Sequence, residues 1–279
     1  MPEHVRSAVN ASGFLFQLRV EEEIKSHGQT HTFRIIAREH PWKHEISGRS
    51  GFADLVLEAG GFRLVVECKR SRQAHWYFVV PADAKPVWRR SALYWIHDTP
   101  GRGQRLGWGS FDVIPTTFES SFCIVRGSGE GDVPLLERIG SLLVDSVEAI
   151  AREEMLHQRG TGRVDGLIYT PVIVTNTTLH VVRCDLSSVD LSTGDIKAVE
   201  SEEVPFLRFR KALSHRFPWP QRAADLRDIS EARQRTLFVV NSKLLTEFLR
   251  IFNLTQRFVP LPWDSAESDN APFSNDLWS

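Results

Sequence analysis

The sequence predicts an α/β fold in which a mixed central sheet is flanked by helices. An amphipathic segment near the N-terminus precedes a pair of apolar strands around a Gly-Gly dipeptide, and a longer amphipathic segment precedes further apolar strands. Helix-period segments that alternate with short apolar runs are typical of helices packed on a sheet. The 279 residues are enough for one elaborated domain with a sizeable core.

The individual elements follow from the spacing of the apolar residues. Residues 7–27 have apolar side chains at helical spacing and predict a helix that ends at Gly28. A longer apolar stripe predicts a second helix over residues 134–157. Further strands are predicted at residues 32–37, 121–126, 170–175, 179–184 and 205–209, and a strand followed by a helix at residues 236–252.

The chain contains no internal repeat and no low-complexity linker, so we expect a single domain. Residues 1–190 would form its core, with an insertion at residues 80–117. Within this insertion, residues 86–117 combine Trp, Gly, Pro and Arg without a clear period and predict an irregular excursion with one short helix. Residues 191–279 would form an appended layer of the same domain, with an irregular tail after Pro260.

Composition and motifs exclude several classes of protein. The net charge of -1 is not that of a protein that binds nucleic acid over its whole surface. No apolar run approaches the roughly 20 residues of a membrane-spanning helix, and no signal-peptide pattern is present, so we expect a cytoplasmic protein without a membrane partner. The three widely spaced cysteines argue against a disulfide framework and a thiolate zinc site. HExxH, GxSxG and GxxxxGK[ST] motifs are absent from the sequence.

The stretch FADLVLEAGGFRLVVECKR is the most informative part of the chain. A two-residue turn at Gly60-Gly61 aligns Glu58 with Arg63 as a favourable charge pair and places the leucines of both strands on one face. Continued along the strands, this register sets Asp54 opposite Glu67, with β-carbons about 5 Å apart. Because the hairpin is apolar on both faces, both carboxylates are expected to be largely buried.

Two carboxylates held together in an apolar setting repel each other and are poorly solvated, which raises a pKa or requires a cation. Mg²⁺ fits this requirement, because it binds through one or two carboxylates and leaves its other positions to water and phosphate. Mn²⁺ is expected to substitute for it. Lys69 lies two residues beyond Glu67, on the same face. Asp54, Glu67 and Lys69 are therefore the candidate residues of a magnesium-dependent nuclease.

The order Asp54, then Glu67-Cys68-Lys69 at the end of an apolar strand, resembles the PD-(D/E)XK nuclease superfamily, which has the restriction endonuclease-like fold. The resemblance covers residues 8–75 together with the later helix and strand. It implies an αβββαβ core within the α/β fold. It also implies that Asp54 and Glu67 hold Mg²⁺, that the backbone carbonyl of Cys68 is a further ligand, and that Lys69 orients or activates the attacking water.

The resemblance also points to the first helix, where many members of the family place a Glu or Gln directed toward the metal. Gln17, Glu21 and Glu22 are the candidates here, and Gln17 and Glu21 share a helix face by their four-residue spacing. The residues themselves do not decide between them. The chain departs from the family pattern at Ala53, where the family has a proline before the aspartate.

Nucleic-acid contacts are expected from cations outside the metal site. Arg70 and Arg72 are followed by a His-Trp-Tyr run, a combination that suits a phosphate backbone with an unstacked base nearby, although these rings would equally well suit the core. Arg208, Arg210 and Lys211 belong to a second, Arg-rich stretch. Ordinary ion pairs on a solvated face are the alternative for this stretch.

The resulting hypothesis is hydrolysis of phosphodiester bonds in DNA. The resemblance alone adds a role in restriction or anti-phage defence, with an activating protein partner or a homo-oligomer. RNA is the first alternative substrate, because no residue identifies recognition of a 2′-hydroxyl. The second alternative is a catalytically silent nuclease-like module that binds nucleic acid or a protein partner.

Overall fold

The computed structural model describes residues 3–71, 75–86, 90–99, 103–125, 135–161, 166–196, 198–213 and 225–255. The helices of this part are α1 (Glu3–Ala11), α2 (Phe14–Ser26), α3 (Leu135–Thr161), α4 (Leu226–Ala232) and α5 (Leu245–Ile251), with 3-10 turns η1 (Leu186–Ser188) and η2 (Ser242–Leu244). The strands are β1 (Arg34–Lys43), β2 (Ser50–Ala59), β3 (Phe62–Lys69), β4 (His75–Pro81), β5 (Arg90–Thr99), β6 (Gly103–Ile114), β7 (Glu119–Ser120), β8 (Phe122–Val125), β9 (Leu167–Thr175), β10 (Thr178–Cys184), β11 (Glu200–Val204), β12 (Phe206–Ala212), β13 (Gln234–Asn241) and β14 (Asn253–Leu254). Within the described ranges, no helix has both the length and the apolarity needed to cross a membrane.

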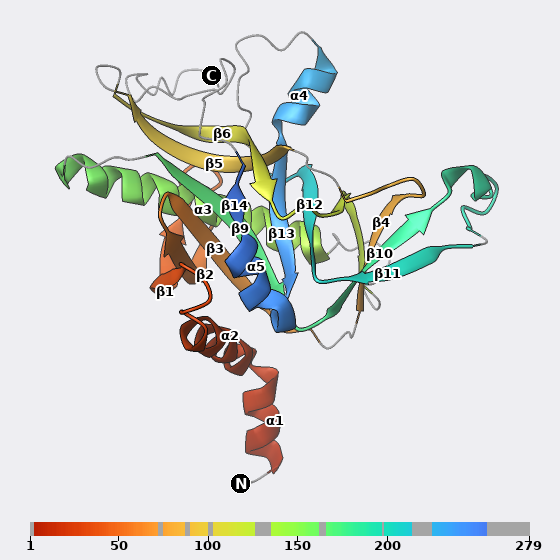
Figure 1. Ribbon diagram of the computed structural model, residues 1–279, viewed down its shortest axis with the longest axis horizontal. Coiled ribbons are helices and arrows are strands. Elements are labelled where there is room, and N and C mark those ends of the chain that lie inside the picture. The colour runs from red at the N-terminus through yellow and green to blue at the C-terminus, as the bar shows by residue number, and fades with distance from the viewer. Residues whose placement is uncertain are drawn as a thin grey trace.

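A mixed sheet of ten strands lies at the centre of the molecule (Figure 1). Its main path runs β1-β2-β3-β9-β13-β12-β7. β1, β2 and β3 are antiparallel neighbours, whereas β9 is parallel to both β3 and β13. β5 pairs with the beginning of β9, and β13 pairs with its end. The predicted α/β class with a mixed sheet is confirmed.

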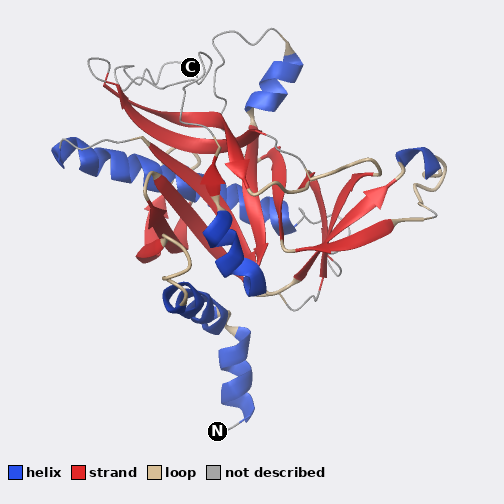
Figure 2. Cartoon of the chain, in the orientation of Figure 1, coloured by secondary structure: helices blue, strands red, loops and turns tan. Residues whose placement is uncertain are grey.

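Helices cover both faces of this sheet, as Figure 2 shows. α3 packs on one face against β1, β2, β3, β5 and β9, whereas α2 and α5 contact each other and pack on β1, β3 and β13. The side chains of β2 alternate accordingly, with Val56 in the apolar cluster that includes α3, and Leu55 and Leu57 in the cluster that includes α2 and α5. The hairpin is therefore buried on both faces, as predicted.

The turn between β2 and β3 has the predicted register. Glu58 lies opposite Arg63, and the Cα pairing continues to Leu55 and Val66. Gly60 has a φ of 55°, a conformation that glycine adopts without a steric penalty. The Arg63 guanidinium lies 3.0 Å from the Glu58 carboxylate, so the charge pair that fixed the predicted register is present.

Three parts of the chain differ from the prediction. The N-terminal segment forms two helices, because Gly13 adopts a φ of 81° between them. β1 continues through Pro41 to Lys43, beyond the strand predicted at residues 32–37. Residues 86–117 contain the long hairpin β5–β6 in place of an irregular excursion with a short helix. Gly109, one of the glycines that suggested a loop, lies under the indole of Trp95, where a Cβ would come within 2.9 Å of the ring.

The region after residue 190 is not an appended layer. β13 is hydrogen-bonded parallel to β9, and β12 is hydrogen-bonded antiparallel to β13, inside the central sheet. Phe238 and Val239, which are fully buried, belong to opposite apolar clusters, so β13 completes the core on both faces. A second sheet has the order β11-β10-β4-β8. The predicted tail after Pro260 lies outside the described residues.

Candidate functional site

Asp54 and Glu67 lie just beyond the point where β2 and β3 stop pairing. The last residue pair between the two strands is Leu55 and Val66, each next in the chain to one of the two acidic residues. A side-chain contact takes over from there, because the backbone N–H of Cys68 donates a hydrogen bond of 2.6 Å to the Asp54 carboxylate. This contact holds the Asp54 side chain against the strand that carries Glu67.

The electrostatics of the two carboxyl groups reflect this arrangement. Burial, followed by the charge of Asp54, raises the pKa of Glu67 to about 7. Burial also raises the pKa of Asp54 to about 6, and the hydrogen bond from Cys68 opposes the rise. The Lys69 ammonium lowers both pKa values. The site therefore combines two poorly solvated carboxyl groups with a nearby cation, an arrangement in which a bound metal ion would relieve the repulsion.

Glu39 on β1 is a third carboxylate at the site, and the sequence interpretation missed it. Its charge raises the pKa values of both Asp54 and Glu67, and its side chain accepts a hydrogen bond from the Gln17 amide. Its φ of 46° is uncommon for a residue other than glycine, and such backbone strain is concentrated at functional sites. No residue pattern in the sequence signals this conformation.

Gln17 is the residue of α2 that the structure brings beside the acidic pair. Besides its contact with β1, its amide nitrogen lies 3.4 Å from the backbone carbonyl of Asp54. Glu21, one turn further along the helix, forms an ion pair of 2.6 Å with Arg38. Glu22 is exposed. The alternatives left open by the sequence therefore reduce to Gln17, and the expectation of Glu21 at the site is corrected because its carboxylate is taken up by Arg38.

The donor set is compatible with a hard cation. Mg²⁺ binds through one or two carboxylates and water, so Asp54 and Glu67 suffice as protein ligands. The Cys68 side chain packs against the apolar cluster that includes α2 and α5, and burial, with Asp54 next, raises the pKa of its thiol well above the usual range. Only its backbone carbonyl could contribute. Across the described ranges, no group of three or more His, Cys, Asp and Glu side chains is arranged to hold an ion.

The predicted nucleic-acid contacts have different outcomes. Arg70 is exposed and directly follows Lys69 at the site, whereas Arg72 lies outside the described residues. Arg208 is fully buried, and its guanidinium donates hydrogen bonds to the hydroxyls of Thr117 at 3.0 Å and Ser91 at 3.3 Å. The expectation that Arg208 contacts nucleic acid is therefore wrong.

Arg210 and Lys211 lie on β12, far from the acidic pair. β12 is separated from β3 by β9 and β13, which places it about 14 Å away at the usual strand spacing. Lys211 pairs with Glu137 of α3, and Arg210 is half-buried. Neither residue belongs to the site around Asp54.

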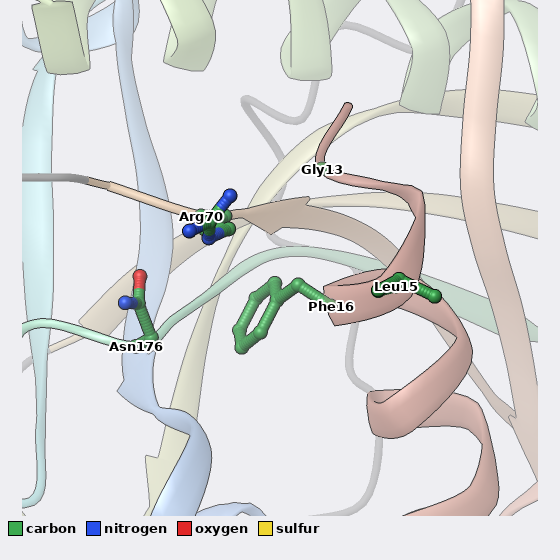
Figure 3. Close-up of a pocket in the computed structure, with 5 residues that line it drawn as sticks. All are labelled: Gly13, Leu15, Phe16, Arg70 and Asn176. Carbon is green, nitrogen blue, oxygen red and sulfur yellow. The ribbon is translucent and has the colours of Figure 1, made fainter. Parts of the chain in front are cut away.

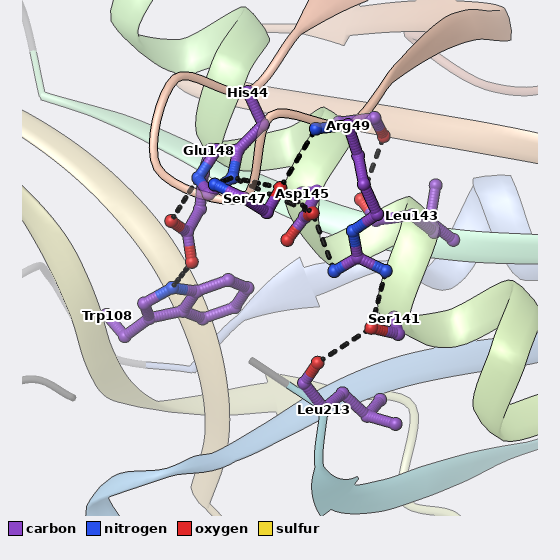
Figure 4. A network of polar contacts seen from close by, with 10 residues as sticks. His44, Ser47, Arg49, Trp108, Ser141, Leu143, Asp145, Glu148 and Leu213 are labelled. Atoms are coloured by element: carbon purple, nitrogen blue, oxygen red, sulfur yellow. Dashed lines mark hydrogen bonds and ion pairs between the residues drawn. The ribbon is translucent and has the colours of Figure 1, made fainter. Parts of the chain in front are cut away.

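A second polar cluster lies between the β1–β2 loop and α3 (Figure 4). His44 is 2.8 Å from the Ser47 hydroxyl and 3.1 Å from the Glu148 carboxylate. A serine, a histidine and an acidic residue are also the members of a serine-hydrolase triad. However, the Ser47 hydroxyl donates to Asp145 at 2.6 Å, and the side chains of His44, Asp145 and Glu148 are at most 4% exposed. The cluster is therefore closed to a substrate and fastens the loop to α3.

This role predicts a large loss of stability when Asp145 is replaced. Its carboxylate lies 2.6 Å from the Arg49 guanidinium, so Asp145→Ala leaves a cation and a hydroxyl in a buried place without this partner. We expect the free energy of unfolding, measured by urea titration, to fall by about 3 kcal/mol. Glu153→Ala, which removes an α3 carboxylate that is 49% exposed and lies 3.0 Å from His40, should cost less than about 1 kcal/mol. Equal losses would show that the buried cluster is not a stabilising tie.

Together, the fold and the site define a mixed α/β protein with a half-buried acidic pair and a lysine at the point where two central strands stop pairing. No protein-family model matches the chain, and no curated protein and no solved structure matches it either.

Proposed function

We propose that this protein is a magnesium-dependent nuclease that hydrolyses phosphodiester bonds in DNA, with a PD-(D/E)XK-like site. The observation that carries the proposal is the apposition of Asp54 and Glu67. Burial, with the charge of Glu39, raises the pKa of Asp54 to about 6. Burial, with the charge of Asp54, raises the pKa of Glu67 to about 7, and Lys69 is close enough to lower both pKa values. A pair of carboxylates that destabilise each other in the absence of a cation is the donor set of a metal-dependent phosphodiesterase.

The order of the elements supports the same proposal. α2 is followed by the antiparallel strands β1, β2 and β3, and α3 then leads to β9, which lies parallel to β3. This is the αβββαβ order that the resemblance implies. β4 to β8 are inserted between β3 and α3, so the insertion leaves the order of the remaining elements intact.

Each residue of the site would have its own role in the proposed reaction. Asp54 and Glu67 would hold the ion, which when bound would stabilise negative charge on the phosphate and lower the pKa of water. Lys69, on the same strand as Glu67, would hold the phosphate and orient the attacking water. Gln17 would position Asp54 and Glu39 through its amide. Partial burial of the pair on the sheet strengthens these electrostatic interactions, because less water screens them than at an exposed surface.

The test is cleavage by the purified full chain of single-stranded DNA, duplex DNA and RNA of one sequence. We expect DNA cleavage with Mg²⁺ or Mn²⁺ and none with EDTA, because both carboxylates need a cation to bind a phosphate. Cleavage of RNA alone would replace the substrate class and keep the site. If no substrate is cut but Mg²⁺ binds in a Glu67-dependent manner, the protein is a silent module. If neither cleavage nor Mg²⁺ binding occurs, the proposed function is wrong.

A further inference from the structure

A cavity of about 220 Å³ lies beside the candidate site, between the start of α2 and the ends of β3 and β9. The residues that line it are Gly13, Leu15, Phe16, Arg70 and Asn176, and Figure 3 shows their arrangement. A water molecule takes about 30 Å³ in the liquid, so this space is large enough for a flat ring and is more than a single water or ion fills.

Three residues that line the cavity are close in sequence to residues of the candidate site or to their strand partners. Phe16 precedes Gln17, Arg70 follows Lys69, and Asn176 follows Thr175, which pairs with Lys69 across β3 and β9. Because consecutive Cα atoms are about 3.8 Å apart, Phe16 and Arg70 are each one residue away from a residue of the site, and Asn176 lies at the end of the neighbouring strand. A polymer with its phosphate at Lys69 that continues past the end of β3 would therefore place an adjoining unit in the cavity.

The side chains of the cavity are suited to a nucleotide. The half-buried Phe16 ring projects from α2 toward Arg70 and Asn176 (Figure 3). The Arg70 guanidinium is exposed, and within the described part of the chain it forms no hydrogen bond or ion pair. An aromatic ring stacks on a base, and a free guanidinium binds a phosphate.

Asn176 adds a polar group of fixed orientation. Its amide accepts a hydrogen bond from the Ser71 N–H at 2.8 Å and donates one to the Ser71 carbonyl at 3.2 Å. A primary amide has two N–H groups and two acceptor lone pairs, so one of each remains for a ligand. The edge of a base presents donors and acceptors together, which such an amide can match.

We propose that this cavity binds an unstacked nucleotide next to the scissile phosphate, with the base on Phe16 and a phosphate on Arg70. The inference rests on the proposed nuclease function and names its substrate class as single-stranded or locally unpaired nucleic acid. A paired base would have to leave its stack to enter, which costs a few kcal/mol in a duplex and much less in a single strand.

The test uses two variants and two matched controls, all in a Glu67→Gln background that prevents product formation during the titration. Phe16→Leu keeps an apolar side chain and removes the ring, and Arg70→Ala removes the guanidinium. Phe14→Ala and Arg19→Ala are the controls. Both side chains belong to α2, as Phe16 does, are 63% and 67% exposed, and do not line the cavity.

Binding is measured by fluorescence anisotropy with a labelled single-stranded oligothymidylate and with a strand of the same length made of abasic residues. In the background protein, we expect the thymidylate to bind about tenfold more tightly than the abasic strand. Phe16→Leu should remove most of this preference, and Arg70→Ala should weaken both strands equally. The two controls should bind as the background does. If the background binds neither strand, or if Phe16→Leu keeps the full preference, or if Arg70→Ala binds like Arg19→Ala, the cavity proposal is overturned.

Because the readout is binding, this proposal and the nuclease function fail separately. A wild-type protein that cuts nothing, together with a Phe16-dependent preference for bases, removes the nuclease function and keeps the cavity as a nucleotide site. A wild-type protein that cuts DNA, together with variants that bind like the controls, removes the cavity proposal and keeps the nuclease.

Discussion

Replacement of Glu67 by glutamine is expected to lower metal-dependent cleavage by at least about 1,000-fold. The amide has nearly the shape of the carboxylate but cannot supply the negative charge that a hard cation requires. The fold should not suffer, because the neutral side chain removes the charge that burial and Asp54 disfavour at this position. Initial rates with Mg²⁺ and the midpoint of thermal unfolding, measured on the same preparation, separate the two effects.

The same loss is expected for Asp54→Asn and for Lys69→Ala, whereas Glu21→Gln is the matched control. Glu21 is an acidic residue of α2 whose carboxylate contacts Arg38, so its replacement changes charge near the site without changing the proposed ligands. Cleavage retained in Glu67→Gln would show that the reaction takes place elsewhere. Equal losses in Glu67→Gln and Glu21→Gln would show that general charge, and not this pair, matters.

The second large effect concerns pH. Mg²⁺ is expected to bind about 100-fold more weakly near pH 5.5 than near pH 8, because protons and the cation compete for the same carboxylate oxygens. The raised pKa values of Glu67 and Asp54, about 7 and about 6, determine the direction of this change in affinity and the pH range over which it occurs. Affinity increases as the pH rises through these values, since both groups then lose their protons. Carboxyl groups with ordinary pKa values near 4 would already be ionised throughout this range.

Isothermal titration calorimetry measures both the affinity and the proton release. The heat of binding near pH 6.5 should change with the ionisation enthalpy of the buffer, because bound protons leave when the ion binds. Glu67→Gln should reduce this buffer dependence together with the affinity. An affinity that does not change between these pH values would mean that the acidic pair does not hold the ion.

Part of the fold was predictable because it depends on neighbours in the chain. The Gly60-Gly61 turn and the opposite charges of Glu58 and Arg63 fixed the hairpin register, and the structure has this register. The long apolar stripe that predicted a helix over residues 134–157 corresponds to α3. In both cases, the pattern and the structure that it produces lie within about two dozen residues.

The errors lie where distant segments decide the environment. Gly109 was one of the glycines that suggested a loop. It lies in a strand, and the Trp95 indole occupies the space that a side chain at this position would need. Arg208 was expected on a surface that contacts nucleic acid. It is buried and donates hydrogen bonds to Thr117 and Ser91, which lie 91 and 117 residues away along the chain. Local composition carries no information about such partners.

The sequence by itself determined the hairpin that carries Asp54, Glu67 and Lys69, because a two-residue turn and the two-residue period of a strand fix which side chains meet. The tertiary structure alone decided that Glu39 joins them and that Gln17 is the helix residue beside them. The first depends on a positive φ in β1 and the second on the rotation at which α2 packs on the sheet. Both are set by long-range packing, which no periodicity within a single segment encodes.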